Sequence, residues 1–191
     1  MKQLITIALA AASLSLHAQT AKDLEVIEWE VPMLPEHVTL DGVISPDEYA
    51  GAMTLDLNYE VSPGYNSKPA LLSTGYAYRT NEALILAFHC EIDPEDFRAT
   101  VQRRDMAWED DFIGIALDVY GDTRNMVYLA SNAYGVQLDL IKTDPSSMRD
   151  QFDLAYNVNY ETWADIQDGY YTIEMRIPFN ALQFAIQTAQ R

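Results

Sequence analysis

The chain has 191 residues, 49% of them hydrophobic, and a formal net charge of −17 at pH 7. This length suits a single domain. A surface so acidic argues against nucleic acid and anionic lipid as partners, because both would be repelled. It remains compatible with neutral ligands such as sugars, with cations, or with a charge that serves only solubility.

Residues 1–18 have the pattern of a secretory signal peptide, with Lys2 near the start, an apolar run from Leu4 to Leu16, and Ala18 before a polar residue. The apolar run is shorter than the ~20 residues that span a bilayer as a helix. Cleavage after Ala18 leaves 191 − 18 = 173 residues. We therefore expect an exported protein, located in the periplasm, in the outer membrane or outside the cell.

Residues 19–37 are predicted to form a leader and a first strand, and residues 38–191 one folded domain. In the domain, a cap residue, a proline and early acids predict a short helix at 45–49. Alternating apolar residues between turn signals predict strands over 38–42, 53–59, 71–80, 83–92, 112–119, 125–132, 136–141, 153–163 and 171–177. This is the pattern of an all-β protein, an antiparallel β-sandwich of roughly eight to ten strands.

The stretch from Arg103 to Asp118 joins a charged loop that carries Trp108 to an alternating strand. Its apolar side, which includes Ile113 and Ile115, predicts one face packed on the core. Loops at such junctions commonly carry binding residues that the strands position. Cys90, the only cysteine, follows apolar residues at a spacing of two, so we expect it to be buried rather than reactive.

Catalytic chemistry finds little support in the residue pattern. A glycosidase needs two carboxylates roughly 5–10 Å apart, but among 29 acids some pair will meet that spacing by chance. His17 lies in the signal region, His37 in a loop and His89 in a strand, and no Ser-His-Asp order, paired-histidine helix or phosphate loop is present. We therefore predict no catalytic site within this chain.

Calcium is an open option, although no cofactor is required by the pattern. Asp110 and Asp111, with Asp118 or Asp122, could supply oxygen ligands. Their spacing matches no EF-hand loop, and consecutive acids are also typical of a solvated face.

A sugar-binding platform is the third option. Sugars stack their apolar faces on aromatic rings, while amides and carboxylates fix the hydroxyl groups. Trp108 lies in a polar loop, and Trp163 ends the polar face of its predicted strand, next to Asn159 and Glu161. Both are candidate ligand-binding residues, and covering an edge of the core is the alternative role for each. Trp29 is predicted to belong to the core.

Several short pieces in the region 38–191 occur in an order and spacing that are fairly specific together: Leu40–Gly42, Asp93–Pro94, Arg103–Asp105, Asp110–Asp118, Ser131–Asp139 and Asp168–Phe179. With these pieces the chain resembles the family 9 carbohydrate-binding modules and their DOMON-like relatives. It is most similar to the N-terminal module of bacterial outer-membrane proteins of unknown function. The resemblance implies a β-sandwich of the DOMON-like or jelly-roll type.

In the sugar-binding members, the resemblance implies a glycan clamped between two tryptophans with polar partners. Trp108 corresponds to one of them, and Asn132 to an asparagine that hydrogen-bonds the sugar. Two positions depart, since Gly114 replaces a glutamate and Ala130 an arginine. The second tryptophan belongs to a segment beyond the end of this chain, so Trp163 is not its match.

The relatives continue past the last residues of this chain, and we expect the chain to stop short of the complete sandwich. The resemblance implies an oligo- or polysaccharide as ligand. It also implies a glycoside hydrolase or a C-terminal outer-membrane barrel as partner. We expect an exported carbohydrate-binding module associated with polysaccharide catabolism. The alternative is a non-catalytic structural or interaction domain of an outer-membrane protein that has lost sugar binding.

Haem binding in the DOMON manner is a further alternative. It needs a methionine–histidine axial pair, which Met126 or Met175 could form with His89.

Overall fold

The computed structural model describes residues 30–35, 38–60, 67–122, 124–143 and 151–182. Apart from Glu30, these residues belong to one compact unit, Val31–Arg191. The predicted signal peptide, most of the predicted first strand, and Trp29 lie outside the described residues. Within the described ranges, no helix is long and apolar enough to cross a membrane.

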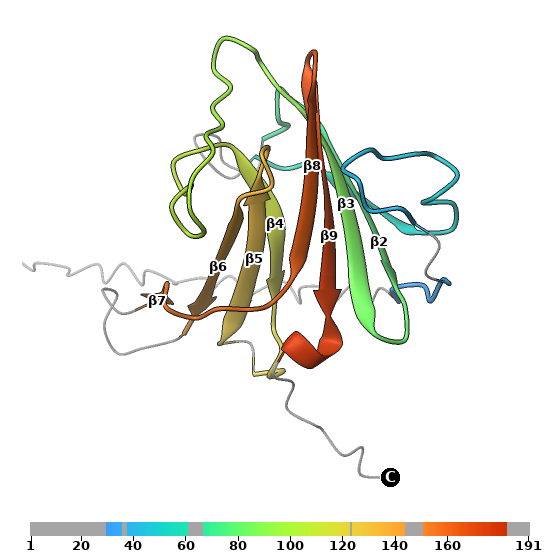
Figure 1. The fold of residues 1–191 in the computed structure, drawn as a ribbon, viewed down its shortest axis with the longest axis vertical. Helices are drawn as coiled ribbons and strands as arrows, with labels where there is room; N and C mark the ends of the chain where they lie inside the picture. The colour runs from blue at the N-terminus through green and yellow to red at the C-terminus, as the bar shows by residue number, and fades with distance from the viewer. Residues whose placement is uncertain (1–29, 36–37, 61–66, 123, 144–150, 183–191) are drawn as a thin grey trace, which may run out of the picture. The chain divides into compact units, whose positions relative to one another are not determined.

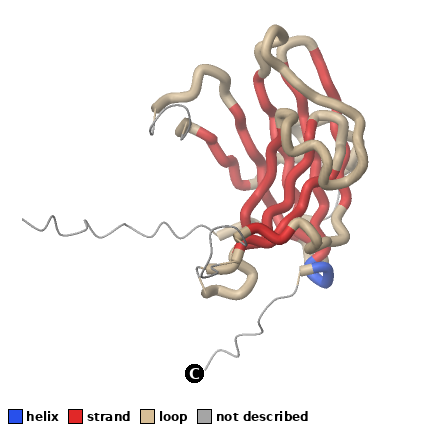
Figure 2. Tube along the Cα trace, turned by 90° about the vertical axis from the view of Figure 1, so that its left-hand side faces the viewer, coloured by secondary structure: helices blue, strands red, loops and turns tan. Residues whose placement is uncertain are grey.

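Two antiparallel sheets make up this unit, which confirms the predicted all-β sandwich (Figures 1 and 2). The five-stranded sheet has the order β1-β2-β3-β9-β8, and the four-stranded sheet the order β4-β5-β6-β7. The strands are β1 (Met53–Leu57), β2 (Ser73–Arg79), β3 (Ala83–Glu91), β4 (Phe112–Leu117), β5 (Met126–Asn132), β6 (Gln137–Lys142), β7 (Phe152–Asp153), β8 (Glu161–Gln167) and β9 (Tyr170–Pro178). The only helix among the described residues is the short 3₁₀ turn η2 (Phe179–Ala181).

The main core lies between the two sheets and follows the alternation of the strands. On β4, Ile113 and Ile115 pack against it, together with the wholly buried Leu129 of β5. From the other sheet, Ile173 of β9 is buried in the same cluster. Cys90, 3% exposed, is a free cysteine of this core, as predicted.

A second, smaller cluster covers the outer face of the five-stranded sheet. Strand β3 reads almost continuously apolar, which is typical of a strand that is buried on both sides. Its outward Ile85 and Ala87 pack with Tyr49 and with partly buried residues of the segment 38–52. Figure 1 shows this segment, in blue and cyan, beside β2 and β3. The N-terminal part of the unit therefore serves as a third layer.

Three predicted elements differ in the structure. Residues 38–42 form no strand, and the N–H groups of Asp41 and Gly42 donate to the Glu174 carboxylate instead of to a neighbouring strand. The predicted helix at 45–49 is a run of turns, in which the Glu48 N–H donates to the Ser45 carbonyl. The predicted strand 153–163 is wrong, since β7 ends at Asp153 and β8 begins at Glu161.

The haem pair is not assembled. Met175 is fully buried between the sheets, whereas His89 alternates with core residues of β3 and so faces outward. The two side chains therefore lie on opposite faces of the five-stranded sheet. Met126 belongs to the other sheet, so neither methionine can share an iron with His89.

Candidate functional site

Trp108 lies against the outer face of the four-stranded sheet. Because Ile113 and Leu129 face the core, the alternate residues Phe112 and Ala130 face outward. The partly buried indole packs on a small cluster of Ala107, Ala130, Val136 and Leu138. The Phe112 ring, 43% exposed, meets the indole edge to face with 5.5 Å between ring centroids. The two rings form an exposed aromatic corner where the loop enters β4.

The loop before this corner is held at Asp110, which is buried. Its Oδ2 accepts hydrogen bonds from the Thr100 N–H at 2.9 Å, the Thr100 hydroxyl at 2.7 Å and the Asn132 amide at 2.9 Å. The other carboxylate oxygen faces Arg98 Nε at 3.6 Å. Burial alone would raise the pKa of Asp110, but these bonds and the Arg98 charge outweigh it and lower the pKa below its usual 3.8. The ionised form is therefore the stabilising one.

Asp110→Asn is expected to lower the free energy of unfolding by about 2 kcal/mol at neutral pH, because one carboxylate oxygen receives three hydrogen bonds. A lowered pKa gives stability that is present above pH 3.8 and is lost as the pH falls through the folded-state value. Urea titrations at several pH values should therefore show the gap to wild type closing below that point. The exposed neighbour Glu109 provides the control, Glu109→Gln, and a gap equal at all pH values would contradict this account.

Arg104 and Asp105 fix the same loop to the edge of β6. The Asp105 N–H donates to the Gln137 carbonyl at 3.0 Å, and Asp105 Oδ1 accepts from the Asp139 N–H at 2.8 Å. Asp105 thus pairs with β6 where β7 does not reach. Its φ of 62° is the left-handed conformation, unusual for a residue other than glycine. These two bonds offset the strain.

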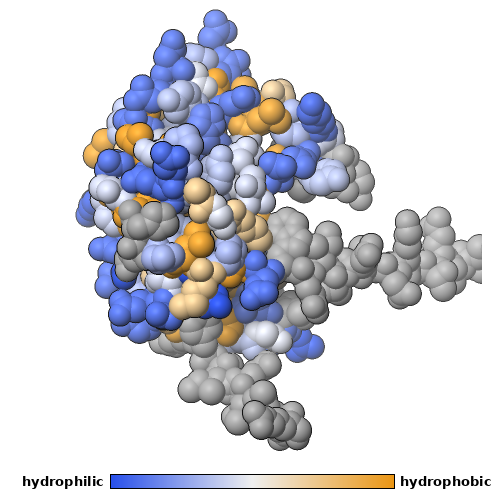
Figure 3. Space-filling view, turned by 90° about the vertical axis from the view of Figure 1, so that its right-hand side faces the viewer, coloured by the Kyte–Doolittle hydropathy of each residue, from blue (hydrophilic) through white to orange (hydrophobic). Residues whose placement is uncertain are grey.

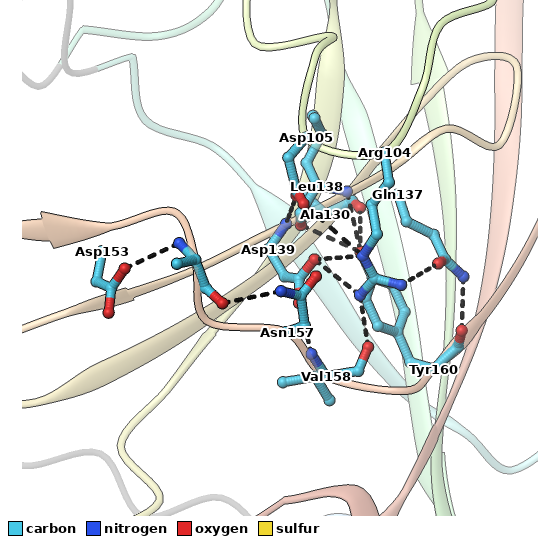
Figure 4. A network of polar contacts seen from close by, with 11 residues as sticks. Arg104, Asp105, Ala130, Gln137, Leu138, Asp139, Asp153, Asn157, Val158 and Tyr160 are labelled. Carbon is cyan, nitrogen blue, oxygen red and sulfur yellow. Dashed lines mark hydrogen bonds and ion pairs between the residues drawn. The ribbon is translucent and has the colours of Figure 1, made fainter.

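The Arg104 side chain joins the loop to the segment before β8 (Figure 4). Its Nε lies 2.8 Å from Asp139 Oδ1, and its Nη1 donates to Gln137 Oε1 at 2.7 Å. Asp139, fully buried, also accepts from the Val158 N–H at 2.6 Å. Burial raises the pKa of Asp139, against the bonds from Val158 and Arg104. The guanidinium lies over the Tyr160 ring, 5.4 Å from its centroid.

Tyr160 is the third member of this network and connects it to β5 and β6. Its hydroxyl donates to the Ala130 carbonyl at 2.7 Å and accepts from the Leu138 N–H at 3.1 Å, so it bridges the backbones of β5 and β6. This explains why the predicted strand 153–163 does not form. The polar groups at 158–160 pair with Asp139, Gln137 and Arg104 instead of with a neighbouring strand.

Asn132 lies at the end of β5 beside this corner, fully buried. Its amide donates to the Thr100 carbonyl and to Asp110, and its Oδ1 accepts from the N–H groups of Tyr134 and Val136, each at 3.0 Å. All of its usual bonds are thus made within the protein. The structure brings Asn132 next to the loop that carries Trp108, and a direct bond from Asn132 to a sugar stays a prediction. The geometry favours a positioning role.

Gly114 and Ala130 stand directly opposite each other on β4 and β5. A Cβ atom at Gly114 would lie 2.1 Å from the Leu129 carbonyl oxygen and 2.6 Å from Ala130 Cα. No side chain fits there without a shift of the backbone. The two positions that depart from the family pattern therefore form the small-residue floor beside Trp108.

Trp163 lies on the other sheet and is not part of this corner. It pairs with Glu174 of β9, and its neighbours in β8, Ala164 and Thr162, are the alternate residues. Since Ala164 packs on the core, Trp163 faces outward from the five-stranded sheet. The two tryptophans are thus on opposite outer faces and cannot clamp one ligand.

The four carboxylates considered for calcium do not converge. Asp110 and Asp111 precede β4, whereas Asp118 and Asp122 follow it. Asp111 accepts from the Arg98 N–H, and Asp118 Oδ1 accepts from backbone N–H groups of its own turn. Across the described ranges, no group of three metal-ligating side chains is gathered.

Phe112 was not among the predicted binding residues. Its signal in the sequence is the alternation that sets it on the side of β4 away from Ile113. Tyr134, 54% exposed in the turn after β5, was missed as well. Phe112 could have been identified from the sequence, because it is an apolar residue on the outward side of a core strand and follows a loop tryptophan.

No protein-family model matches the sequence, and no curated protein matches it. Solved structures do share its fold. A candidate carbohydrate-binding protein from Bacteroides uniformis ATCC 8492 is 15% identical, with a TM-score of 0.60 over 80% of this chain and 72% of that one.

A family 9 carbohydrate-binding module from Caldicellulosiruptor kristjanssonii, in complex with cellotriose, is 13% identical, with a TM-score of 0.50 over 77% of this chain and 65% of that one. A family 9 module from the same organism in complex with glucose is 14% identical, with a TM-score of 0.51, over 82% and 70% respectively. At these identities the likeness concerns the fold. The chain thus has a β-sandwich fold similar to that of family 9 carbohydrate-binding modules.

Proposed function

We propose that this chain binds an oligo- or polysaccharide without catalysis, at the aromatic corner formed by Trp108 and Phe112. The observation that carries the proposal is the half-exposed Phe112 ring, held edge to face against an indole whose loop is anchored on both sides. Rigid aromatic surfaces at the mouth of a sandwich suit the apolar face of a sugar ring. The likeness in fold to sugar-bound modules supports the same ligand class.

The anchoring contacts matter for affinity as well as for position. A platform that is ordered before binding loses less conformational entropy when the ligand arrives. Asp110 and Asp105 hold the two ends of the loop around Trp108 by bonds to buried partners. Arg103 and Glu109 are exposed and lie next to the corner in sequence, where their polar groups can meet hydroxyl groups; one oxygen of Glu109 pairs with Arg98 at 3.4 Å.

Trp108→Ala and Phe112→Ala are each expected to weaken glycan binding at least tenfold, on the order of 1.4 kcal/mol or more, because aromatic anchors dominate such interfaces. The measurement is a screen of the full chain against soluble oligosaccharides, glucose and cellotriose among them, and insoluble polysaccharides. Calorimetry then gives the affinity of each variant.

Trp163→Ala is the matched control, since it removes the same side chain from the opposite outer face. It should leave affinity for this glycan unchanged. Absence of binding to every glycan would refute the proposal. Binding that survives both corner substitutions would leave a sugar-binding protein but reject this site.

The second candidate function, a structural or interaction domain, has one observation in its favour. The segment that leads to Trp108 carries two exposed apolar side chains, Val101 at 79% and Met106 at 60%, and Tyr134 in the turn after β5 is 54% exposed. Exposed apolar groups of this kind also serve protein–protein contact. This function would be favoured if no glycan binds in the screen and if the chain associates with itself in a concentration-dependent way that Met106→Glu removes.

The proposal extends to export of the chain and to association with a glycoside hydrolase or a membrane partner, as the resemblance implies. Secretion of a reporter fused to residues 1–18 tests the first part. Retention of the reporter in the cytoplasm would contradict it.

A further inference from the structure

A cleft lies on the opposite side of the sandwich from the aromatic corner of Trp108, on the outer face of the five-stranded sheet. Its volume is about 380 Å³, within the usual range for small-ligand sites. Strands β2, β3, β8 and β9 supply its floor, and the segment around residues 43–49 forms its wall. Figure 3 looks onto this side of the molecule, where hydrophobic side chains form separate small patches among hydrophilic ones.

Two aromatic surfaces line the cleft. The Tyr170 ring stacks on His89, with 4.5 Å between centroids and an interplanar angle of 25°. Tyr76 lies against Tyr49 with centroids 5.6 Å apart. Tyr49 is buried, whereas the other three rings are partly exposed. The cleft thus offers flat ring surfaces whose orientation is set by a second ring behind them.

Hydrogen-bonding groups lie beside these rings. Asp165 and Gln167 are alternate residues of β8 and share its outer face, and the Gln167 amide donates to Asp165 Oδ2. This bond leaves Asp165 Oδ1 and Gln167 Oε1 as acceptors, so the edge of the cleft is rich in acceptors for hydroxyl donors. The Thr172 hydroxyl is already used, since it donates to the Gly42 carbonyl.

The wall of the cleft is fixed in place by Glu174, which is fully buried. Its Oε2 accepts from the N–H groups of Asp41 at 2.9 Å and Gly42 at 2.7 Å, and its Oε1 accepts from the Tyr49 hydroxyl at 2.6 Å. Gly42 has a φ of +91°, and a Cβ there would lie 2.7 Å from the Ala164 backbone. Only glycine lets the chain pass this close to the β8 backbone. The position of the cleft wall is therefore fixed by specific contacts.

We infer that this cleft is a separate binding site for a neutral sugar ring, a monosaccharide or the end residue of a glycan. Ring faces at Tyr170 and Tyr76 take the apolar side of the ring, and Asp165 with Gln167 accept neighbouring hydroxyl groups. The inference shares the ligand class of the proposed function and none of its residues. Each site can therefore fail without the other.

An organic cation is the competing ligand, because aromatic rings beside a carboxylate also bind ammonium groups. Two features favour the sugar. Asp165 is the only acid that lines the cleft within the described residues, and its carboxylate already accepts a hydrogen bond from Gln167.

The test is a saturation-transfer and chemical-shift titration of the full chain with glucose, galactose, mannose and xylose, and with tetramethylammonium as the cation probe. Tyr170→Ala and Asp165→Ala should each weaken monosaccharide binding at least tenfold. Trp108→Ala should leave the shifts that a monosaccharide causes at the cleft residues unchanged, also for a sugar that binds at the aromatic corner as well. Glu161→Gln is the control, because Glu161 is an exposed residue of the same strand that does not line the cleft. Denaturant titration checks that each variant folds.

Binding of one of the four sugars that is lost in both cleft variants and kept in Trp108→Ala would support the site. The inference is overturned if no monosaccharide binds, if only tetramethylammonium binds, or if binding follows Trp108 instead. Asp165 lies in an edge strand and is partly exposed, so Asp165→Ala remains informative even if Tyr170→Ala unfolds.

Discussion

Replacing Arg104 with alanine is expected to lower the free energy of unfolding by about 3–5 kcal/mol, because it leaves a fully buried carboxylate without its cation. Arg104 is the only cation paired with Asp139 among the described residues. It also donates to Gln137 and lies over Tyr160, so its loss leaves the loop of Trp108 attached to β6 through Asp105 alone.

Denaturant unfolding of the full chain measures this effect. Arg103→Ala is the matched control, since the neighbouring arginine is exposed and its loss should change stability by less than about 0.5 kcal/mol. The double variant Arg104→Met with Asp139→Leu removes both charges and should recover much of the stability. Equal, small effects of the two arginine variants would show that the network contributes little.

Glu174→Ala is expected to cost about 3 kcal/mol or more. The substitution leaves the buried Tyr49 hydroxyl and the N–H groups of Asp41 and Gly42 without an acceptor, and each unmet group carries a desolvation cost of about 1–3 kcal/mol. The segment 41–49 should loosen from the sheet. Glu161→Ala, on the same outer face but exposed, is the control and should have little effect.

The pH dependence of Glu174 gives a second readout. Burial raises the pKa of this carboxyl above 4.5, against hydrogen bonds from Tyr49 and Gly42. A raised pKa means that the folded state holds a proton that the unfolded chain has released. Its contribution to stability is therefore full below pH 4.5 and is lost as the pH rises through the folded-state value.

Glu174→Gln mimics the protonated acid at every pH. Wild type should therefore lose stability relative to Glu174→Gln between pH 4.5 and neutrality. Urea titrations of both proteins across this range measure the difference. A constant difference, or one that grows in favour of wild type, would contradict the raised pKa.

Strands with a strict alternation could be predicted from the sequence, because alternation reports directly which side chains are buried. The strands predicted over 71–80 and 83–92 pair as the hairpin of β2 and β3, and β4 has its apolar side on the core. Both depend on local pattern and on contacts between neighbouring segments.

Other features depend on contacts between distant residues and leave no such pattern. The Val158 N–H donates to the Asp139 carboxylate, 19 positions away, instead of to a strand partner. The alternation over 153–163 therefore predicted a strand that does not form. The correct element, β8, alternates as well, with Trp163 and Asp165 on its outer side. Trp163 does lie on an outward-facing side of a strand, but that strand is β8 (Glu161–Gln167) and not the predicted strand 153–163.

The candidate site shows the same division. Trp108 could be identified from a tryptophan in a polar loop, whereas its small-residue floor could not. That floor arises because Gly114 and Ala130 meet across two strands. The cleft on the five-stranded sheet is lined by residues of four strands and of a distant segment, so Tyr170 and Tyr76 come together only in the folded chain.

The most direct test of the central claim follows the indole N–H signals of the three tryptophans during titration of the isotope-labelled full chain with the tightest glycan of the screen. Trp108 is assigned by the signal missing in Trp108→Phe. Its Nε1 is buried and has no hydrogen-bond partner among the described residues, which should give it a distinct resonance. The account predicts a saturable shift at Trp108 while the Trp163 signal stays in place. A Trp108 signal unmoved at saturating glycan, or a shift confined to Trp163, would contradict it.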